Sequence, residues 1–457
     1  MTQLAYSYKI NPLQPPAAEL RRLRALQLTR LNATIAHARA HSRFYQQHLA
    51  GVAPNGLASL EDLPTLPLMD AGVFNHGLEA LLCVSPAEVS RIVTLETSGA
   101  TGEPKRVAFT AADQQATRDY FAAGMRMLAD AGEAIAVLYP CERPGGLGAL
   151  LLEACEQMGA RPLAIGIPNS FAALAASLGR EQARGLVGFP QHVFSFARWC
   201  EYNRIKLKIS GVLLSADNVA ATLRNEIARI WNCDVFEHFG MTESGYGGAV
   251  DCPHHQGLHV RESDLIVEVI DPLSGQPRAS GQWGELVIST LGREAMPLLR
   301  YRTGDHSRLL TGTCPCGSPL KRISSVRPRA AEQIIAGGQT YSMAQLEESL
   351  FALPGVLDFK AELDDRASEL LITVQLLGDP EPKQESSEQC SPKPDERRDQ
   401  QLQRQPDQSI QKPLLQLPQW PGTRTIIEYS PEFRPYYPAK RTITRLPGVR
   451  TASPSSQ

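Results

Sequence analysis

The most informative segment of the chain is Leu95-Glu-Thr-Ser-Gly-Ala-Thr-Gly-Glu-Pro-Lys105. Its two glycines leave the backbone free to curl with the amide groups pointing inward, and its hydroxyl side chains and lysine add further donors. Such a loop suits a polyphosphate, because amides and one lysine offset negative charge without bulky side chains. The flanking residues 91–94 and 106–109 are typical of short strands, which predicts a strand–loop–strand element. Taken alone, the segment is also compatible with an ordinary Gly/Thr turn.

Length and composition restrict the class of protein. A chain of 457 residues is long enough for two or more domains with a large core, and its content of 42% hydrophobic and 21% charged residues is that of a soluble globular protein. A formal net charge of −2 argues against a dedicated nucleic-acid binder. The N-terminus lacks an apolar targeting segment and no apolar run is long enough to span a bilayer, so we expect a cytoplasmic protein without a membrane partner. Nine scattered cysteines fit reduced thiols better than a disulfide framework.

The pattern of apolar residues changes along the chain. Residues 17–48 show helical spacing, and between residues 112 and 231 apolar strand-length segments alternate with helical ones, which favours a mostly parallel, helix-covered sheet. After about residue 260 the pattern is typical of antiparallel strands, and a smaller α+β unit follows from about Ser325. We predict an α/β fold. Its large N-terminal α/β domain, residues 1–323, would hold parallel sheets and a β-rich subdomain, and a small C-terminal α+β domain would span residues 324–457.

Residues 378–413 are low in complexity. They are rich in Gln, Glu, Asp, Lys, Arg, Pro and Ser, and contain almost no aliphatic residues. Such a segment buries too little apolar surface to offset the entropy of ordering, so we predict a disordered insertion within the small domain.

Three further segments follow the opening loop in a fixed order. They read Glu237-His-Phe-Gly-Met-Thr-Glu243, Leu299-Arg-Tyr-Arg-Thr-Gly-Asp305 and Arg434-Pro-Tyr-Tyr-Pro-Ala-Lys-Arg441. Each one alone is compatible with a strand-end turn or a solvated basic loop. Together with the loop, they make the chain resemble the adenylate-forming superfamily of acyl-CoA synthetases, and within it the phenylacetate–CoA ligase branch. The resemblance runs from about residue 63 to residue 445, excluding the insertion.

The match has departures. Ala100 replaces a threonine of the family's loop, and Phe239 replaces a tyrosine, whereas the third segment matches throughout. Leu214-Ser-Ala-Asp-Asn218 is similar to the family's turn at the adenine pocket. The family's acidic hinge residue is missing from Arg322-Ile-Ser-Ser-Val-Arg-Pro-Arg-Ala330, where Arg327 is the candidate for the family's arginine. The resemblance therefore implies adenylation more directly than the domain rotation that the family's thioester step uses.

The resemblance implies ATP, magnesium and coenzyme A as cofactors, and a role for each matched residue. The loop would hold the β- and γ-phosphates, Thr242 would contact the α-phosphate, and Glu243 would bind magnesium, a cation that prefers carboxylate oxygen. Asp305 would accept hydrogen bonds from the ribose hydroxyls, and Phe239 would stack on adenine. The implied nucleotide-binding residues are Thr97, Ser98, Gly99, Thr101, Gly102, Lys105, Ser215, Ala216, Glu237, His238, Phe239, Gly240, Met241, Thr242, Asp305 and Arg327.

Lys105, Thr242, Glu243 and Lys440 are the implied catalytic residues. In the superfamily, a lysine of the mobile small domain acts at the α-phosphate in a Gly-Lys-x-x-Arg context, and Lys440 stands at the matching place with Ala439 for glycine. Negative charge builds up at the reacting centre during adenylation, so a cation there is expected to stabilise the transition state. A solvated Lys–Arg pair is the alternative, with Arg441 as a competing cation.

A separate group of residues points to a metal. Cys252-Pro-His-His-Gln-Gly-Leu-His259 and Cys314-Pro-Cys-Gly317 together offer four zinc ligands, although buried free cysteines are also common. We predict a structural zinc on Cys252, His259, Cys314 and Cys316, with His254 or His255 as alternates for the histidine. Some members of the phenylacetate–CoA ligase branch carry a similar structural site.

The resemblance implies an ATP-dependent carboxylate–CoA ligase that forms an acyl-adenylate, with an aryl acid such as phenylacetate favoured. One alternative keeps adenylation but changes the acceptor, as in an adenylyltransferase that modifies a coenzyme or loads a carrier protein. A non-catalytic nucleotide-binding module is the alternative of another class, and the intact Lys105, Glu243 and Asp305 argue against it. The oligomeric state stays open, a homodimer included.

Overall fold

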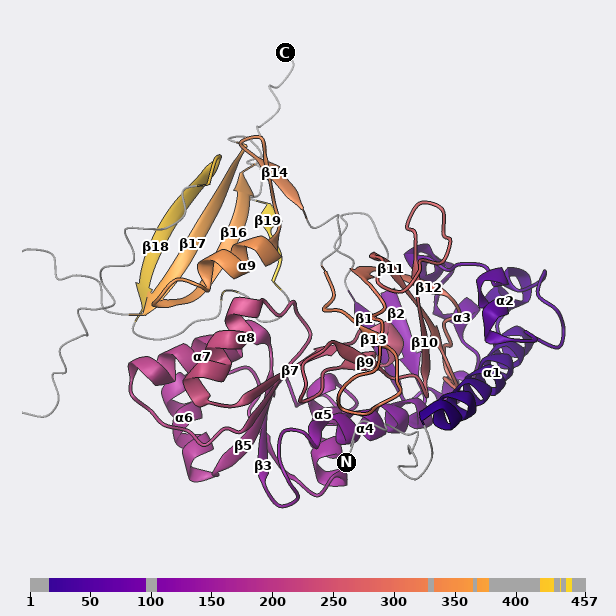
Figure 1. The fold of residues 1–457 in the computed structure, drawn as a ribbon, viewed down its shortest axis with the longest axis horizontal. Coiled ribbons are helices and arrows are strands. Elements are labelled where there is room, and N and C mark those ends of the chain that lie inside the picture. Colours follow the sequence, from indigo (N-terminus) through magenta and orange to yellow (C-terminus); the bar gives the residue numbers. More distant parts are fainter. Residues whose placement is uncertain are drawn as a thin grey trace, which may run out of the picture.

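The computed structural model describes residues 16–95, 105–327, 333–364, 368–377, 420–430, 436 and 441–445. These residues form a large unit up to residue 327 and a smaller unit from residue 333 onward (Figure 1). Within this part of the chain, no helix combines the length and apolar character needed to cross a bilayer.

The large unit is built around an eight-stranded sheet with the order β13-β9-β8-β7-β6-β5-β3-β4. Five neighbouring strands are parallel, and β8, β9 and β13 continue the sheet in antiparallel pairing. The parallel strands are β3 (Ala134–Leu138), β4 (Arg161–Ala164), β5 (Ala183–Gly188), β6 (Gly211–Leu214) and β7 (Asp234–Phe239). The antiparallel strands are β8 (Ala249–Val250), β9 (Leu258–Val260) and β13 (Arg322–Ile323).

Helices connect and cover the parallel strands, as the alternating sequence pattern predicts. They are α4 (Ala111–Met125), α5 (Leu147–Gln157), α6 (Phe171–Arg180), α7 (Pro190–Tyr202) and α8 (Ala221–Trp231). β3 is buried along its whole length, in keeping with a strand that is covered on both faces. β4 stops at Ala164, and Gly166 just beyond it has a φ of +74°, which breaks the extended backbone.

An antiparallel sheet and a hairpin complete the large unit. The sheet joins β10 (Leu265–Ile270), β11 (Gly284–Thr290) and β12 (Tyr301–Ser307). The hairpin pairs β1 (Arg91–Leu95) with β2 (Lys105–Phe109) and sets Leu95 opposite Lys105, which confirms the predicted flanking strands. The loop between them, including Thr97, Ser98, Gly99, Thr101 and Gly102, lies outside the described residues.

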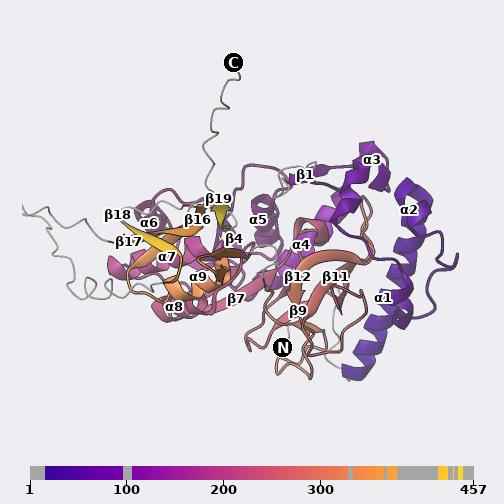
Figure 2. The same ribbon diagram turned by 90° about the horizontal axis from the view of Figure 1, so that it is seen from above.

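Helices at the N-terminal end pack beside this antiparallel sheet, at the end of the molecule away from the small unit (Figure 2). The long helix is held by polar contacts to the turn before β10, among them Arg30 to Asp264 at 3.1 Å. The segments here are α1 (Pro16–His41), α2 (Arg43–His48), η1 (Leu60–Thr65), η2 (Ala71–His76), α3 (Leu78–Leu81) and η3 (Pro86–Glu88).

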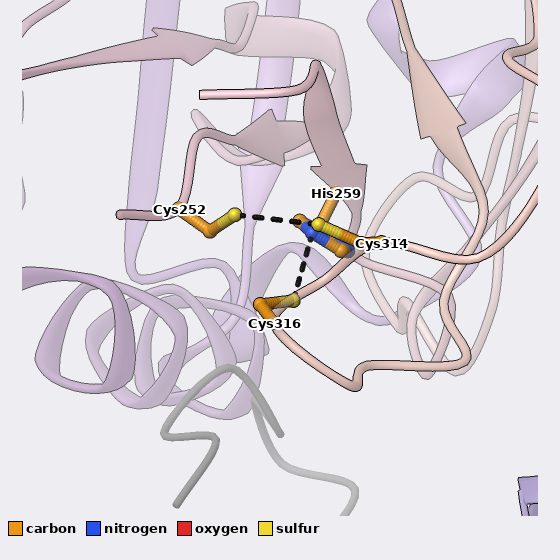
Figure 3. A group of neighbouring side chains, drawn as sticks. All are labelled: Cys252, His259, Cys314 and Cys316. Atoms are coloured by element: carbon orange, nitrogen blue, oxygen red, sulfur yellow. Dashed lines mark hydrogen bonds between the residues drawn. The ribbon is translucent and has the colours of Figure 1, made fainter. Parts of the chain in front are cut away.

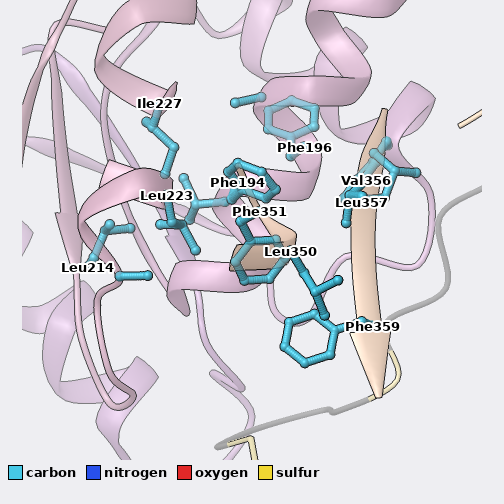
Figure 4. Packing of buried hydrophobic residues seen from close by; sticks show 14 of the residues in the cluster. Phe194, Phe196, Leu214, Leu223, Ile227, Leu350, Phe351, Val356, Leu357 and Phe359 are labelled. Atoms are coloured by element: carbon cyan, nitrogen blue, oxygen red, sulfur yellow. The ribbon is translucent and has the colours of Figure 1, made fainter. Parts of the chain in front are cut away.

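The small unit is a four-stranded sheet of order β18-β17-β16-β19 with one helix and a short hairpin. Its elements are β14 (Ile334–Ala336), β15 (Gln339–Tyr341), α9 (Met343–Leu350), β16 (Val356–Asp364), β17 (Glu369–Leu377), β18 (Thr423–Ser430) and β19 (Thr444–Arg445). The unit packs on α7 and α8, and one continuous hydrophobic core joins it to the large unit (Figure 4). Within that core, the rings of Phe194 and Phe351 have centroids 4.6 Å apart.

The segment that joins β17 to β18 lies outside the described residues and gives the first prediction. β17 and β18 are parallel, with Leu370 opposite Thr423 and Leu377 opposite Ser430. The connection must therefore return along the strand, a distance on the order of 23 Å at roughly 3.3 Å per residue. Replacing residues 378–413 by a Gly/Ser linker of roughly eight residues spans that distance together with the retained residues. Because loop-closure entropy depends weakly on length, we expect the free energy of unfolding to change by no more than about 1–2 kcal/mol.

Urea unfolding of the full chain and of this deletion would measure the difference. A deletion of residues 378–419 closed by a two-residue turn is the control, because the few residues left before β18 cover only about 20 Å at roughly 3.3 Å per residue and should disrupt β18. Strong amide protection across residues 378–413 in hydrogen exchange would contradict the expected disorder of the segment.

Candidate nucleotide site and cysteine–histidine cluster

A cavity of about 240 Å³ lies where β6 and β7 end and the small unit meets the large one. The carboxyl ends of parallel strands are a common place for ligands in α/β folds, because the chain leaves the sheet there and opens a crevice. Residues from both units form its wall: Ala216–Val219, Glu237–Met241, Leu258, Asp305, Ser325–Arg327, Met343, Ala344 and Arg441.

The turn after β6 forms one side of the cavity. Ala216 has a φ of +71°, a left-handed conformation that an L-residue seldom adopts and that turns the chain away from the sheet. Ser215 lies just behind the cavity wall, where its carbonyl oxygen accepts a hydrogen bond from the Tyr139 hydroxyl at 2.9 Å. Its own hydroxyl lies 2.7 Å from Nδ1 of His238. Burial lowers the pKa of His238 to about 3, so this ring is neutral.

The end of β7 supplies a buried carboxylate and an aromatic ring. Glu237 accepts a hydrogen bond from the Ser325 hydroxyl at 2.8 Å and lies 3.8 Å from Arg224. Burial raises the pKa of Glu237, although Ser325 and Arg224 act in the opposite direction. Phe239 lines the cavity two residues further along the same strand. Residues two apart on a strand point to the same side, so the carboxylate and the ring face the cavity together.

Asp305 reaches the cavity from within β12, and not from the strand-end turn that was one interpretation of its segment taken alone. Its amide donates to the Thr303 hydroxyl at 3.0 Å, and that hydroxyl donates to the carbonyl oxygen of Leu286 at 2.8 Å. Next to it, the amide of Gly304 donates to Glu285 at 3.1 Å. These bonds hold the backbone that leads into Asp305.

Arg327 lies at the mouth of the cavity and is fixed by an aromatic neighbour. Its guanidinium stacks over the ring of Trp283 at 3.5 Å, and its amide donates to the carbonyl oxygen of His306 at 2.8 Å. Trp283 had no place in the sequence-based prediction, because it stands one residue before β11 and far from the motif of Arg327 along the chain.

Lys105 and Glu243 form an ion pair beyond the cavity, with Nζ and Oε1 2.5 Å apart. Nζ also donates to the Tyr301 hydroxyl at 3.0 Å. Burial acts to lower the pKa of Lys105, but Glu243 and Tyr301 together hold it above its usual value. Thr242 and Glu243 begin the short helix η4 (Thr242–Ser244) that follows the cavity wall at Met241.

The structure thus brings together the described residues of two groups. Around the cavity lie Ala216, Glu237, His238, Phe239, Gly240, Met241, Asp305 and Arg327. Beside it lie Ser215, Thr242, Glu243 and Lys105, which do not line the cavity. Lys440 lies outside the described residues, as do the loop residues between β1 and β2.

The sequence analysis missed several cavity residues from both units. Asp217 and Asn218 belong to a segment that it quoted without assigning them a role, and their polarity next to Ala216 was the available signal. Met343 and Ala344 carry no such signal, since they look like ordinary helix residues.

Cys252, His259, Cys314 and Cys316 lie together on one side of the large unit (Figure 3). Their ligand atoms all lie within 4.8 Å of one another, with Sγ of Cys252 and Cys314 3.6 Å apart and Sγ of Cys316 3.4 Å from Nε2 of His259. These spacings fit tetrahedral zinc, where sulfur ligands at about 2.3 Å from the metal are separated by about 3.8 Å.

The alternates for the histidine lie elsewhere. His255 is hydrogen-bonded through Nδ1 to Asp251 at 2.6 Å, and the side chain of His254 is exposed. Both residues stand in the turn between β8 and β9, and neither belongs to the group of ligand atoms that lie within 4.8 Å of one another. The donor set of the cluster is therefore three thiols and the imidazole of His259.

Comparisons with known proteins agree on one group of enzymes. The sequence is 30% identical over 348 residues to a phenylacetate–coenzyme A ligase of Thermus thermophilus, covering 74% of this chain and 77% of that protein. It is 29% identical to the ligase of the same name from Escherichia coli, covering 75% and 78% of the two chains. No protein-family model matches the sequence.

Solved structures share the fold. A 2-hydroxyisobutyryl-CoA ligase in the postadenylation state, in complex with an adenylate, matches with a TM-score of 0.68 at 19% identity, covering 80% of this chain and 82% of the other. The same ligase in the thioesterification state, with adenylate and CoA, matches with a TM-score of 0.62 at 20% identity, covering 80% and 83%. At this identity the likeness concerns the fold alone, which confirms the predicted α/β class.

Proposed function

The chain belongs to the phenylacetate–coenzyme A ligase family, and from this membership we propose that it joins a carboxylic acid to coenzyme A at the expense of ATP. The reaction runs through an acyl-adenylate. The observation that supports this most directly is the convergence of Phe239, Asp305 and Arg327, from three separate elements, on one cavity at the strand ends. An aromatic ring, a carboxylate and a guanidinium are the groups that an adenine, a ribose and a phosphate would require.

The first step combines two anions and therefore depends on position and charge. A carboxylate oxygen of the acid attacks the α-phosphorus of ATP, the bond to the β-phosphate breaks, and pyrophosphate leaves. In this proposal Phe239 stacks on the adenine and Asp305 accepts hydrogen bonds from the ribose hydroxyls. Lys105 and the loop that precedes it hold the outer phosphates, and Thr242 contacts the α-phosphate.

Magnesium would be held by the carboxylate of Glu243. The residues fit this ion, because Glu243 is an oxygen ligand beside the proposed phosphate site, already positioned by its contact with Lys105. When bound, magnesium supplies positive charge at the phosphate oxygens. Arg293 donates to the backbone carbonyl of Glu243 and stacks on Phe109, which fixes the backbone from which this carboxylate projects.

The second step transfers the acyl group to a thiol. The sulfur of coenzyme A attacks the acyl carbon of the adenylate, the bond to the phosphate oxygen breaks, and AMP leaves. An aryl acid such as phenylacetate is the proposed substrate, since relatives that are 30% and 29% identical are named phenylacetate–coenzyme A ligases. The acyl group is expected near Tyr139, whose ring lies 4.7 Å from that of Phe189.

Incubation with ATP, magnesium, coenzyme A and a panel of carboxylic acids tests whether coenzyme A accepts the acyl group. We expect an acyl-CoA thioester by mass spectrometry, with aryl acids the best substrates. Acid-dependent AMP formation that does not lead to a thioester would favour a different acceptor, such as another coenzyme or a carrier protein. ATP binding without turnover across the panel would favour the non-catalytic alternative.

We also propose a structural zinc on the cysteine–histidine cluster. The cluster is buried, except that Cys316 is partly exposed, and it connects the turn after β8 with β9 and the loop before β13. Its four residues are neither among those that line the cavity nor part of the Lys105–Glu243 pair, so its proposed contribution is to stability and not to chemistry.

Metal analysis of the purified protein is expected to find about one zinc per chain. Cys314→Ser should lower the zinc content and the melting temperature while ATP binding persists, because a tetrahedral site with three ligands left binds zinc more weakly. Cys141→Ser is the matched control, since this cysteine lies outside the cluster and should leave zinc in place. Metal-free protein with the melting behaviour of the metal-bound form would contradict the proposal.

A further inference from the structure

Arg441, for which a solvated basic loop was one alternative from the sequence, is buried between the two units. Only 1% of its side chain is exposed, and its guanidinium donates to Asp358 at 2.6 Å and to the carbonyl oxygen of Phe359 at 2.5 Å. It also lies 3.4 Å from Glu347, and stacks on the rings of Phe359 and Phe351 at 4.1 and 5.0 Å. All these partners belong to the small unit.

The same group of residues continues into the large unit. The backbone amide of Arg441 donates to Asp217 at 2.8 Å, and Nδ2 of Asn218 donates to Glu347 at 2.8 Å. Asp217, Asn218 and Arg441 also line the cavity. We call Asp217, Asn218, Glu347, Asp358 and Arg441 the Arg441 cluster.

Burying these charged groups costs free energy, which their contacts with one another must offset. Carboxylates and guanidinium groups are seldom fully buried unless they are paired, because taking a charge out of water is expensive. Burial raises the pKa of Glu347, while the nearby Arg441 acts to lower it. Such a buried group is weak evidence for stability, but it favours one arrangement of the elements that carry it, because few arrangements satisfy every partner.

A second contact also fixes the small unit to the segment that follows β6 in the large unit. α8 begins after Ala220, whose side chain cannot cap a helix. Glu348 of α9 takes this role from the small unit, accepting hydrogen bonds from the amides of Ala221 at 2.5 Å and Thr222 at 3.1 Å. The Thr222 hydroxyl adds a third bond to the same carboxylate at 2.7 Å. The helix that carries Glu347 is thus fixed to the element that follows Asp217 and Asn218.

From these contacts we propose that Arg441 is a positioning residue for the adenylation step. Its guanidinium fixes Asp358 of β16 and Glu347 of α9. Glu347 and the backbone amide of Arg441 in turn bind the turn after β6, which closes the nucleotide cavity with the wall that the small unit provides. The inference rests on the proposed function. Aligning ATP with a carboxylate needs a complete cavity, whereas transfer to a thiol needs the adenylate to be accessible. Loss of the cluster should therefore slow adenylation far more than thioester formation.

The test measures the two half-reactions separately in Arg441→Met, Asn218→Ala and Glu348→Ala. Adenylation is followed by acid-dependent exchange of labelled pyrophosphate into ATP, and transfer by mixing synthetic acyl-adenylate with coenzyme A. We expect a loss of at least about tenfold in adenylation for Arg441→Met and about threefold for each of the other two, with transfer within about twofold of the parent. Arg441→Lys, which keeps the charge, should recover part of the loss.

Glu362→Gln is the matched control. It removes an ion pair with Lys360, and both residues lie on β16 outside the Arg441 cluster, so both half-reactions should stay unchanged. Hydrogen exchange at the amides of Ala221 and Thr222 provides a readout besides activity, and these amides should exchange faster in Glu348→Ala.

Two results would overturn the inference. One is an equal loss in both half-reactions, and the other is a lower melting temperature of Arg441→Met with unchanged adenylation. If Arg441→Met does not fold, Asn218→Ala and Glu348→Ala decide the question, because Asn218 is only partly buried and Glu348 is exposed. Absence of acid-dependent pyrophosphate exchange in the parent protein would instead count against the proposed function. This result is distinct from the two results that would overturn the role of Arg441, because both of those require an active parent protein.

Discussion

Glu243→Gln is expected to slow formation of the acyl-adenylate by on the order of 100-fold or more, the scale seen when a preorganised electrostatic group is removed. The Glu243 side chain is 5% exposed and lies 2.5 Å from Lys105. Glutamine keeps its volume and can still accept a hydrogen bond from that lysine, but it loses the charge that would bind magnesium. The effect should therefore appear in the rate of adenylation, with a higher magnesium requirement.

Tyr301→Phe is the control for this variant. It removes the other polar contact of Lys105 while it leaves the Glu243 carboxylate in place, so we expect a loss of only a few-fold. Pyrophosphate exchange and the melting temperature would be measured for both. A Glu243→Gln protein with the exchange rate of the parent, or one that loses exchange only because it is unfolded, would remove Glu243 from the proposed magnesium site.

Lys440→Ala is expected to slow adenylation by a similar factor, on the order of 100-fold or more. The reason is the charge that builds up on the α-phosphate and the attacking carboxylate, for which Lys105 at the outer phosphates is not positioned. In the proposed mechanism Lys440 supplies the cation at this centre. Transfer from preformed acyl-adenylate to coenzyme A should change far less, because no pyrophosphate leaves in that step.

Lys360→Ala controls for the loss of a lysine from the small unit, since Lys360 lies on β16 and pairs with Glu362. Its half-reactions should match those of the parent. Arg441→Lys distinguishes the roles of residues 440 and 441. The Arg441 cluster is expected to hold the small unit against the large one, whereas Lys440 is expected to stabilise negative charge at the α-phosphate. A loss of the same size in both half-reactions of Lys440→Ala would contradict the assignment.

The fold could be predicted from the sequence where neighbouring residues alone determine the secondary structure. Alternating apolar strands and amphipathic helices gave α4 to α8 and the parallel sheet, because each strand there is short, apolar and followed by a helix of matching length. The hairpin of β1 and β2 was predictable for the same reason. The class of the fold followed from this pattern before any comparison.

The pairing of strands that are far apart in the sequence was harder to predict. The parallel pairing of β18 with β17 depends on where a connection of low-complexity sequence returns, and nothing in that sequence specifies the register. The sequence also left the placement of Asp305 inside β12 open, because its segment alone was compatible with a strand-end turn. Its segment is polar enough to resemble a turn, but Gly304 and Thr303 pair their backbone or side chains within the sheet.

The lining of the cavity proposed as the nucleotide site could be predicted only where it lies in contiguous segments. Glu237 to Met241 is one such segment, and it contributes a run of adjacent residues to the cavity wall. Arg441 and Trp283 could not be assigned in this way. The burial of Arg441 results from Asp358 and Glu347, which lie far away in the sequence, and the position of Arg327 results from stacking on Trp283.

Exchange of labelled pyrophosphate into ATP, in the absence of coenzyme A, tests the proposed adenylation most directly. Reversible formation of an acyl-adenylate predicts exchange that requires both magnesium and a carboxylic acid, with AMP and pyrophosphate as the products of the forward reaction. Aryl acids should support the fastest exchange. Formation of ADP and phosphate instead, or exchange that is indifferent to the acid across the panel, would contradict the account.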